Sequence, residues 1–210
     1  ANYIWNTRLE LTSVFNLFFK DTQTVTITAK DTGSGVDKIF YYLSKEPLPV
    51  DIAEWTEYNG VFNIVPNNEY VIYAKIIDKA GNCSYINSEG MVLDNIVPVI
   101  MVQIAGGFSA VSDGAEYQKT QTFKVQDNYL KQVTVNNVPI SLSEEGTFVL
   151  KASDNKYTIE AEDKAGNKVV YTISVNREAG AGSVAIEGWT YGEEPNQPII
   201  EDTNNVGYTI

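Results

Sequence analysis

The 210-residue sequence contains no histidine and one cysteine. Histidine is the side chain most often used as a general base near neutral pH and the commonest ligand of transition metals, so its absence argues against hydrolase triads and zinc sites. Cys83 has no second cysteine to pair with, which excludes an intrachain disulfide. Without a histidine beside it, Cys83 is also a poor candidate for a catalytic nucleophile. We therefore expect this chain not to be an enzyme.

Long apolar runs and an excess of basic residues are missing as well. No apolar stretch approaches the roughly 18 residues that a membrane-spanning helix requires. The net charge is -12, and residues 178–210 carry acidic but no basic side chains. Because such a chain repels phosphate backbones and anionic lipid, we expect no nucleic acid and no membrane among its partners. The first six residues lack the basic start and apolar core of a signal peptide, so we expect a processed piece of a larger protein.

The pentapeptide Asp-Lys-Ala-Gly-Asn occurs twice, at 78–82 and at 163–167. Strand-like sequence surrounds both copies, and a duplicated turn with matching flanks indicates a tandem β repeat. We predict one domain over 1–94 and a second over 95–177. Residues 178–210 are then a linker and the truncated start of a third repeat, in which a new strand begins at Ser183.

Alternating polar and apolar residues predict the strands of both copies. In the first copy these are 8–19, 24–31, 36–44, 60–64, a strand that starts at Tyr70, and 83–93; in the second they are 99–105, 122–127, 130–136, 146–150, a strand that starts at Tyr157, and 168–175. Asp31 and Asp127 end matching strands in phase with the buried face. About seven short strands per copy predict an all-β chain of two immunoglobulin-like Greek-key sandwiches plus a short C-terminal β segment.

Two features mark the strand that starts at Tyr70 in the first copy and at Tyr157 in the second, which is the sixth of the seven expected strands. A polar turn residue precedes Tyr70 by three positions, and the same spacing precedes Tyr157. This predicts a tyrosine corner, in which the ring packs inward and the hydroxyl bonds back to the preceding loop. At the other end of the strand, Gly81 and Gly166 are expected to supply the positive φ that the repeated turn needs.

The spacing of Asp127, Gly146, Tyr157 and the turn at 163–167, after the linker 94–98, resembles the bacterial Ig-like repeats found in tandem on surface proteins of Gram-positive bacteria. The first copy resembles the same group through residues 31–36 and 78–82. The resemblance covers about residues 8–177 and implies an extracellular spacer or adhesion module, secreted or on the cell surface. The segment 188–195 resembles the opening of a further, different surface repeat.

Three carboxylates and one amide make a candidate calcium site. In a sandwich of this topology the loops after the second and sixth strands lie where the chain enters the module, which brings Asp127 and Asp163 close to Asp94. With Asn167 and backbone carbonyls they approach the six to eight oxygens that calcium requires. Calcium there would stiffen the junction of the two modules. The alternative, which the sequence favours, is that the pentapeptide is only a hairpin turn, and no other cofactor is expected.

Aromatic residues offer a second candidate site, because sugar rings stack on flat aromatic faces. The first copy presents Phe40, Tyr42, Trp55 and Tyr58, and the tail adds an aromatic pair at 189 and 191. The favoured alternative is that Trp55 fills the sandwich interior and the tail pair belongs to the core of the third repeat. A Lys-to-Asn amide cross-link is not expected, since the strand lysines at 30, 75, 124 and 168 all alternate outward.

The sequence therefore predicts a non-catalytic spacer or adhesion part of a larger bacterial surface protein, whose partners are neighbouring domains of that protein. Two alternatives stay open. One is an adhesin module that binds a host or cell-wall glycan or protein. The other is a set of accessory domains belonging to a secreted carbohydrate-active enzyme.

Overall fold

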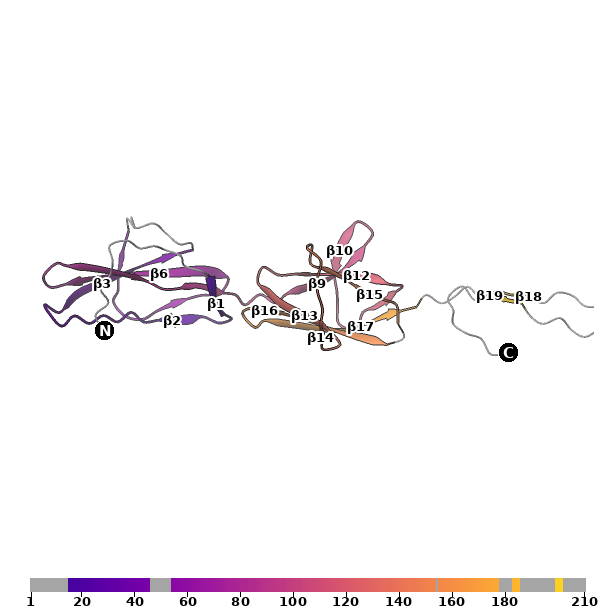
Figure 1. Cartoon of the computed structure of the whole chain (residues 1–210). Coiled ribbons are helices and arrows are strands. Elements are labelled where there is room, and N and C mark those ends of the chain that lie inside the picture. Colours follow the sequence, from indigo (N-terminus) through magenta and orange to yellow (C-terminus); the bar gives the residue numbers. More distant parts are fainter. Residues whose placement is uncertain (1–14, 46–53, 154, 178–182, 186–198, 202–210) are drawn as a thin grey trace, which may run out of the picture. The chain divides into compact units, whose positions relative to one another are not determined.

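The computed structural model describes residues 15–45, 54–153, 155–177, 183–185 and 199–201, which form strands, turns and loops (Figure 1). Among these residues no helix has the length and apolar character needed to cross a membrane. The chain forms two compact units. The first contains residues 1–98 with 127–131 and 162–168, and the second contains 99–126, 132–161 and 169–210.

The first unit has one large sheet and one small one. Its strands are β1 (Phe15–Phe19), β2 (Gln23–Val25), β3 (Val36–Ser44), β4 (Thr56–Glu57), β5 (Phe62–Ile64), β6 (Asn68–Asp78), β7 (Cys83–Asn87) and β8 (Gly90–Leu93). The large sheet has the order β1-β8-β6-β3-β4, with β7 also paired to β6, and β2 pairs with β5. The long strand β6 pairs with β8 at its start and with β7 further along.

The two sheets of the first unit face each other across an apolar core. Tyr41 of β3 stacks on Phe62 of β5 with ring centroids 4.2 Å apart, and Tyr58 meets Phe62 edge-on. Ile64 and Val71 are buried in the same unit. Since Tyr41 points inward, its neighbours on β3 point to the outer face of the large sheet.

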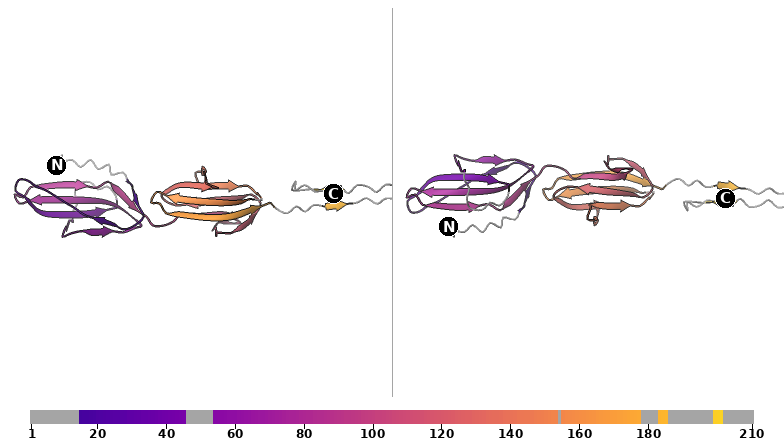
Figure 2. Two further views of the ribbon diagram at one scale, coloured as in Figure 1. Left: turned by 90° about the horizontal axis from the view of Figure 1, so that it is seen from below. Right: turned by 90° about the horizontal axis from the view of Figure 1, so that it is seen from above.

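The second unit repeats this plan with more strands. They are β9 (Val99–Ile104), β10 (Gly107–Ala110), β11 (Glu116–Gln118), β12 (Gln121–Gln126), β13 (Leu130–Val135), β14 (Val138–Pro139), β15 (Thr147–Leu150), β16 (Lys156–Asp163) and β17 (Lys168–Asn176). One sheet has the order β10-β9-β12-β15 and the other β11-β17-β16-β13-β14. Figure 2 shows the strands of this unit from two further sides. Phe123 and Phe148 stack in the core, and Tyr117 from the other sheet meets Phe123 edge-on.

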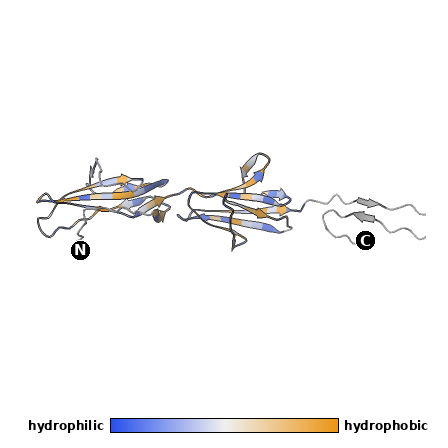
Figure 3. Ribbon diagram, turned by 45° about the horizontal axis from the view of Figure 1, so that its top comes forward, coloured by the Kyte–Doolittle hydropathy of each residue, from blue (hydrophilic) through white to orange (hydrophobic). Residues whose placement is uncertain are grey.

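Both units pair a short early strand in parallel with the last strand, β1 with β8 and β11 with β17. The pairings of β6 with β3, β7 and β8 and of β9 with β10 and β12 are antiparallel. Gly90 allows β1 to approach β8, because a Cβ there would lie 2.9 Å from the ring of Phe15. Hydrophobic and polar residues alternate along the strands, as two-layer packing requires (Figure 3). The predicted all-β, immunoglobulin-like sandwich fold is confirmed.

Some predicted strand limits are wrong. The strand predicted over 24–31 is only β2, because its partner β5 is equally short and the backbone N–H of Ile27 donates to the hydroxyl of Tyr58 instead. Asp31 is exposed rather than in phase with a buried face. The strand predicted over 83–93 is split into β7 and β8, since Ser88 Oγ takes the hydrogen bond of Ile72 N.

In the tail, β18 (Ser183–Ala185) pairs antiparallel with β19 (Ile199–Glu201), so the strand expected to begin at Ser183 is confirmed. The predictions for Trp189 and Tyr191 lie outside the described residues, as does the part of the first predicted strand before Phe15.

Candidate functional site

The three carboxylates named from the sequence lie together. Asp94 follows β8, Asp127 follows β12 and Asp163 ends β16, and one carboxylate oxygen from each lies within 4.8 Å of the others. All three belong to the first compact unit. Asp163 is 0% exposed and Asp94 7% exposed, while Asp127 is partly buried. This is the one group of three or more potential metal-ligating side chains among the residues described.

Backbone N–H groups hold each carboxylate in place through one oxygen. The bonds are Ile96 N to Asp94 Oδ1 at 2.9 Å, Tyr129 N to Asp127 Oδ1 at 2.7 Å and Asn167 N to Asp163 Oδ1 at 2.8 Å. Asp94 and Asp127 each keep a second oxygen that receives no hydrogen bond from a described residue. The carboxylates are thus oriented by the backbone and still have lone pairs to offer.

Asn167 is the fourth member of the group. Its side chain is fully buried, and its Nδ2 donates to Asp163 Oδ2 at 2.7 Å and to the backbone oxygen of Asp94 at 2.8 Å. Its Oδ1 is the one buried side-chain polar atom without a hydrogen-bond partner among the described residues. A buried carbonyl oxygen without a partner costs about 1–3 kcal/mol, so this position calls for an explanation.

The charges of the cluster are not compensated. None of the three carboxylates forms an ion pair with a lysine or arginine in the described ranges. At the effective dielectric constant of about 20 that suits partly buried sites, two carboxylates about 5 Å apart repel by roughly 3 kcal/mol. Burial raises the pKa of Asp127, and the charges of Asp163 and Asp94 raise it further, against the opposing hydrogen bond from Tyr129 N.

Neighbouring contacts hold the segments 127–131 and 162–168 in place. Tyr129 donates its hydroxyl to Glu69 Oε1 at 2.5 Å, and this bond is the main reason that the pKa of Tyr129 rises to about 12. The ring of Tyr129 also meets Phe18 edge-on at 5.6 Å, and Lys164 Nζ lies 5.2 Å from the centroid of the Phe18 ring. Sequence reasoning missed Glu69 and Tyr129, because residues so far apart in the chain leave no local pattern.

The first copy of the pentapeptide makes the same internal bonds in a different setting. Asn82 N donates to Asp78 Oδ1 at 2.8 Å and Asn82 Nδ2 to Asp78 Oδ2 at 2.7 Å. Asn82 is exposed and Asp78 partly exposed. The bonds from Asn82 are the main reason that the pKa of Asp78 is lowered. The nearby Asp31 accepts the N–H groups of Gly33 and Gly35, which lower its pKa.

The structure separates the four aromatic residues predicted as a binding surface. Tyr58 packs with Tyr41 and Phe62 on the inner side, and its hydroxyl accepts the N–H of Ile27. Phe40 and Tyr42 alternate with Tyr41 and so lie on the outer face, where both are half-buried. Tyr58 is therefore not part of one surface with the other three.

Trp55 lies on the outer face rather than inside the sandwich. Trp55 directly precedes β4 and Tyr85 belongs to β7, the strands that flank β3 and β6. Three strand spacings, about 14 Å, separate such strands, yet the two ring centroids are 5.9 Å apart. The rings must therefore extend toward each other over β3 and β6.

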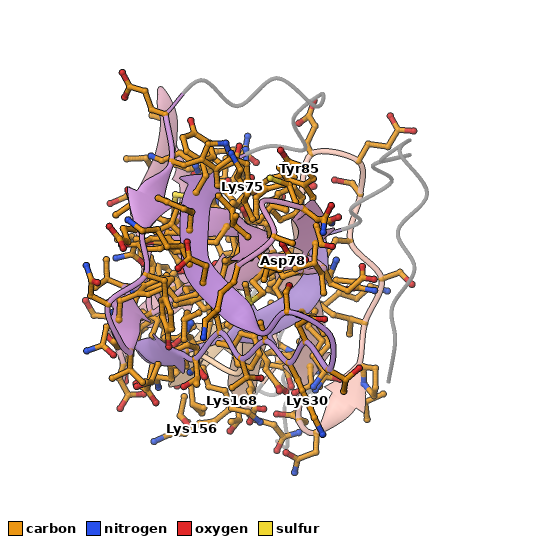
Figure 4. The ribbon with its side chains drawn as sticks, turned by 90° about the vertical axis from the view of Figure 1, so that its left-hand side faces the viewer. Lys30, Lys75, Asp78, Tyr85, Lys156 and Lys168 are labelled. Carbon is orange, nitrogen blue, oxygen red and sulfur yellow. The ribbon has the colours of Figure 1, made fainter. Side chains whose placement is uncertain are left out.

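Lys75 lies within this aromatic group. It pairs across the sheet with Tyr85 on one side, and both residues are labelled in Figure 4. On the other side it pairs with Phe40, and its Nζ lies 6.0 Å from the centroid of the Phe40 ring. We call Phe40, Tyr42, Trp55, Lys75 and Tyr85 the outer aromatic face. Sequence reasoning missed Lys75 and Tyr85, although the strand alternation placed Lys75 outward.

The residues predicted as markers of the fold make the following contacts. The hydroxyl of Tyr70 donates to Val65 O at 3.1 Å, and that of Tyr157 donates to Lys151 O at 2.8 Å. Gly81 and Gly166 have φ angles of 86° and 88°. Cys83 is exposed and free.

Comparisons with known proteins add little about function. The family model of a domain of unknown function, DUF7743, matches residues 10–104. No curated protein matches the sequence.

Three solved structures resemble the chain at low identity. The fibronectin(III)-like modules of CbhA from Clostridium thermocellum are 15% identical, with a TM-score of 0.32, 79% of this chain covered and 92% of that one. SGBP-B of the Bacteroides ovatus mixed-linkage glucan utilization locus, in complex with a mixed-linkage heptasaccharide, is 9% identical, with a TM-score of 0.28 and coverages of 91% and 74%. The sialic acid binding region of a Streptococcus sanguinis SK1 adhesin, bound to 3'sLn, is 12% identical, with a TM-score of 0.18 and coverages of 75% and 70%. At TM-scores this low, the similarities carry no argument about this chain.

Proposed function

We propose that this chain is a non-catalytic pair of extracellular modules, 1–94 and 95–177, within a larger bacterial surface protein, and that it holds a functional domain away from the cell wall. The observation that carries the proposal is the duplication. The same sandwich plan, with the same parallel edge pairing and the same pentapeptide turn, occurs twice in succession. Repetition of one folded unit adds length without adding a reactive centre.

The lack of catalytic chemistry supports the same proposal. The sequence has no histidine, and its one cysteine is an exposed thiol with no histidine to activate it. The described carboxylates that come together are held by backbone N–H groups around a common point, which suits ion binding better than proton transfer. Neighbouring domains of the same protein are its partners in this proposal.

Display on a cell surface tests the spacer role. The chain is placed between a wall anchor and an epitope tag, and antibody access to the tag is measured by flow cytometry. Deleting residues 15–177 should reduce access severalfold, and replacing them with two unrelated sandwiches should restore it. Equal antibody access with and without residues 15–177 would refute the proposal.

A second candidate function, carbohydrate binding, is favoured by the outer aromatic face. Two rings that extend over a sheet offer flat apolar surface, and the ammonium of Lys75 among them offers a hydrogen-bond donor and a positive charge. A pyranose ring stacks on such a surface. An acidic sugar would in addition place its carboxylate near Lys75.

A glycan array that includes neutral and uronic acid oligosaccharides tests this candidate. We expect binding by the full chain, loss of binding in Trp55→Ala, and no loss in Phe108→Ala, which removes an aromatic ring 37% exposed on β10. Absence of any glycan signal, or equal loss in both variants, would leave spacing as the function of the modules.

A further inference from the structure

We propose that Asp94, Asp127, Asp163 and Asn167 form a calcium-binding site within the first compact unit. This inference concerns an ion that the spacer role does not require, so the two proposals stand or fall separately.

The spacing of the carboxylates fits a single coordination sphere. Calcium binds oxygen at about 2.3–2.6 Å, so two ligands on opposite sides of the ion are about 5 Å apart. One oxygen from each of the three aspartates lies within 4.8 Å of the others. One ion can therefore contact all three residues after small side-chain rotations.

Asn167 gives independent evidence for a ligand at this point. Its amide head faces the cluster, since Nδ2 contacts both Asp163 Oδ2 and Asp94 O, yet its fully buried Oδ1 has no partner among the described residues. Because Oδ1 and Nδ2 are bonded to the same carbon, Oδ1 also lies beside the cluster. A cation bound by Oδ1 satisfies this buried oxygen, while Nδ2 keeps its two acceptors.

The buried carboxylate of Glu162, next to the cluster, has lysine partners that the three aspartates lack among the described residues. Glu162 is buried like Asp163, and two lysines compensate it, Lys131 Nζ at 2.9 Å and Lys168 Nζ at 3.2 Å. Asp163, the next residue, has no ion pair with a described lysine or arginine, and two further carboxylates face it. Buried charges are ordinarily paired or bound to a metal, and a cation at the cluster provides that partner.

The chemistry of the donors selects calcium. Every ligand is an oxygen: three carboxylates, the amide of Asn167 and the backbone carbonyl of Asp94, with water to complete six to eight. The sequence contains no histidine, and Cys83 lies on another strand, so the nitrogen and sulfur ligands that zinc prefers are missing.

The first copy of the pentapeptide provides a matched control within the same chain. Asp78 and Asn82 reproduce the bonds of Asp163 and Asn167, but Asn82 is exposed, and no third carboxylate completes a cluster there among the described residues. The inference therefore assigns calcium binding to the second copy and not to the first.

The full chain, stripped with a chelator and exchanged into metal-free buffer, is titrated with calcium chloride by isothermal calorimetry and by thermal unfolding. We expect one calcium per chain with a dissociation constant at or below about 1 mM, and a higher melting temperature. Asp127→Asn keeps the size of the side chain and the oxygen that accepts Tyr129 N, and should weaken binding at least about tenfold. Asp78→Asn should bind like the parent chain.

Three results would overturn the proposal. They are no heat and no rise in melting temperature at millimolar calcium, an equal loss in Asp127→Asn and Asp78→Asn, or equal affinity for magnesium. Terbium luminescence gives a second measurement on the unmodified chain should Asp127→Asn fail to fold, because terbium binds at oxygen sites and is excited through nearby tyrosines. Added calcium should displace the terbium and lower the luminescence. Luminescence that calcium does not lower would count against the site.

Discussion

The two copies of Asp-Lys-Ala-Gly-Asn have the same backbone turn and the same Asp-to-Asn hydrogen bonds, yet the Asp and Asn of the second copy are buried and those of the first are more exposed. Asp163 and Asn167 have no solvent exposure, whereas Asn82 is exposed. The turn is therefore a local property of five residues. Its chemistry depends on what packs against it.

The carboxylates beside the two turns extend this contrast. The pKa of Asp31, next to the first copy, is lowered by the N–H groups of Gly33 and Gly35, while burial raises the pKa of Asp127 next to the second. The same residue type at matching repeat positions is thus stabilised as an anion in one place and destabilised in the other. A duplicated motif has kept its structure while its electrostatic environment has diverged.

Truncating the asparagine should give the largest difference between the copies. Asn167→Ala leaves Asp163 Oδ2 and Asp94 O buried without their donor, so we expect the free energy of unfolding to fall by about 3 kcal/mol. Asn82→Ala exposes the matching groups to water, and its loss should be less than half as large. Urea denaturation of both variants in chelator measures the difference, and equal losses would show that burial does not distinguish the copies.

Substituting the turn glycine should lower the stability by the same amount in both copies. Gly81 and Gly166 both have positive φ, and an added Cβ meets nothing within 4 Å at either position. Gly81→Ala and Gly166→Ala should each cost about 1 kcal/mol from backbone strain alone. Thermal unfolding checks this, and a cost several times larger in one copy would contradict the view that the turn is a local unit.

Removing one charge from the cluster should have effects of opposite sign with and without calcium. In chelator, Asp127→Asn relieves repulsion between carboxylates and should stabilise the chain by about 1 kcal/mol after allowance for solvent screening. In millimolar calcium the parent chain should be the more stable of the two. Melting temperatures of both chains under both conditions test this. If Asp127→Asn melts at a lower temperature than the parent chain in chelator, the three carboxylates do not repel one another as we infer.

The smallest effect concerns Asp31 and pH. Because its pKa is lower in the folded chain, Asp31 contributes stability that is present above its ordinary value of 3.8 and is lost as the pH falls through the lower folded value. The parent chain should therefore be slightly more stable than Asp31→Asn at pH 6, and this advantage should shrink at the acid end. If the stability difference between the parent chain and Asp31→Asn grew as the pH fell, the pKa of Asp31 would not be lowered by folding.

Local patterns in the sequence predicted the features that depend on a few neighbouring residues. Strand β3 has the predicted limits, since alternation over nine residues leaves little choice of register. The grouping of Asp94, Asp127 and Asp163 also followed from topology, because loops at the same end of a sandwich lie close together. These inferences required no knowledge of side-chain packing.

Features that depend on distant side chains could not be predicted. Strand β2 ends early because the hydroxyl of Tyr58 takes the backbone N–H of Ile27, 31 positions earlier in the chain. The burial of Asn167 depends on Asp94 O, 73 positions away. Trp55 lies on the outer face because Tyr85, from a strand three places across the sheet, meets its ring. None of these contacts has a local signature.

The calcium site that we propose contains the second copy of the repeated turn and not the first. Crystals of the full chain, grown with calcium and measured at a wavelength where calcium scatters anomalously, locate the ion. We predict one anomalous peak in contact with Asp94, Asp127, Asp163 and the side-chain oxygen of Asn167. A map without a peak there, or with an equal peak beside Asp78, would contradict the claim.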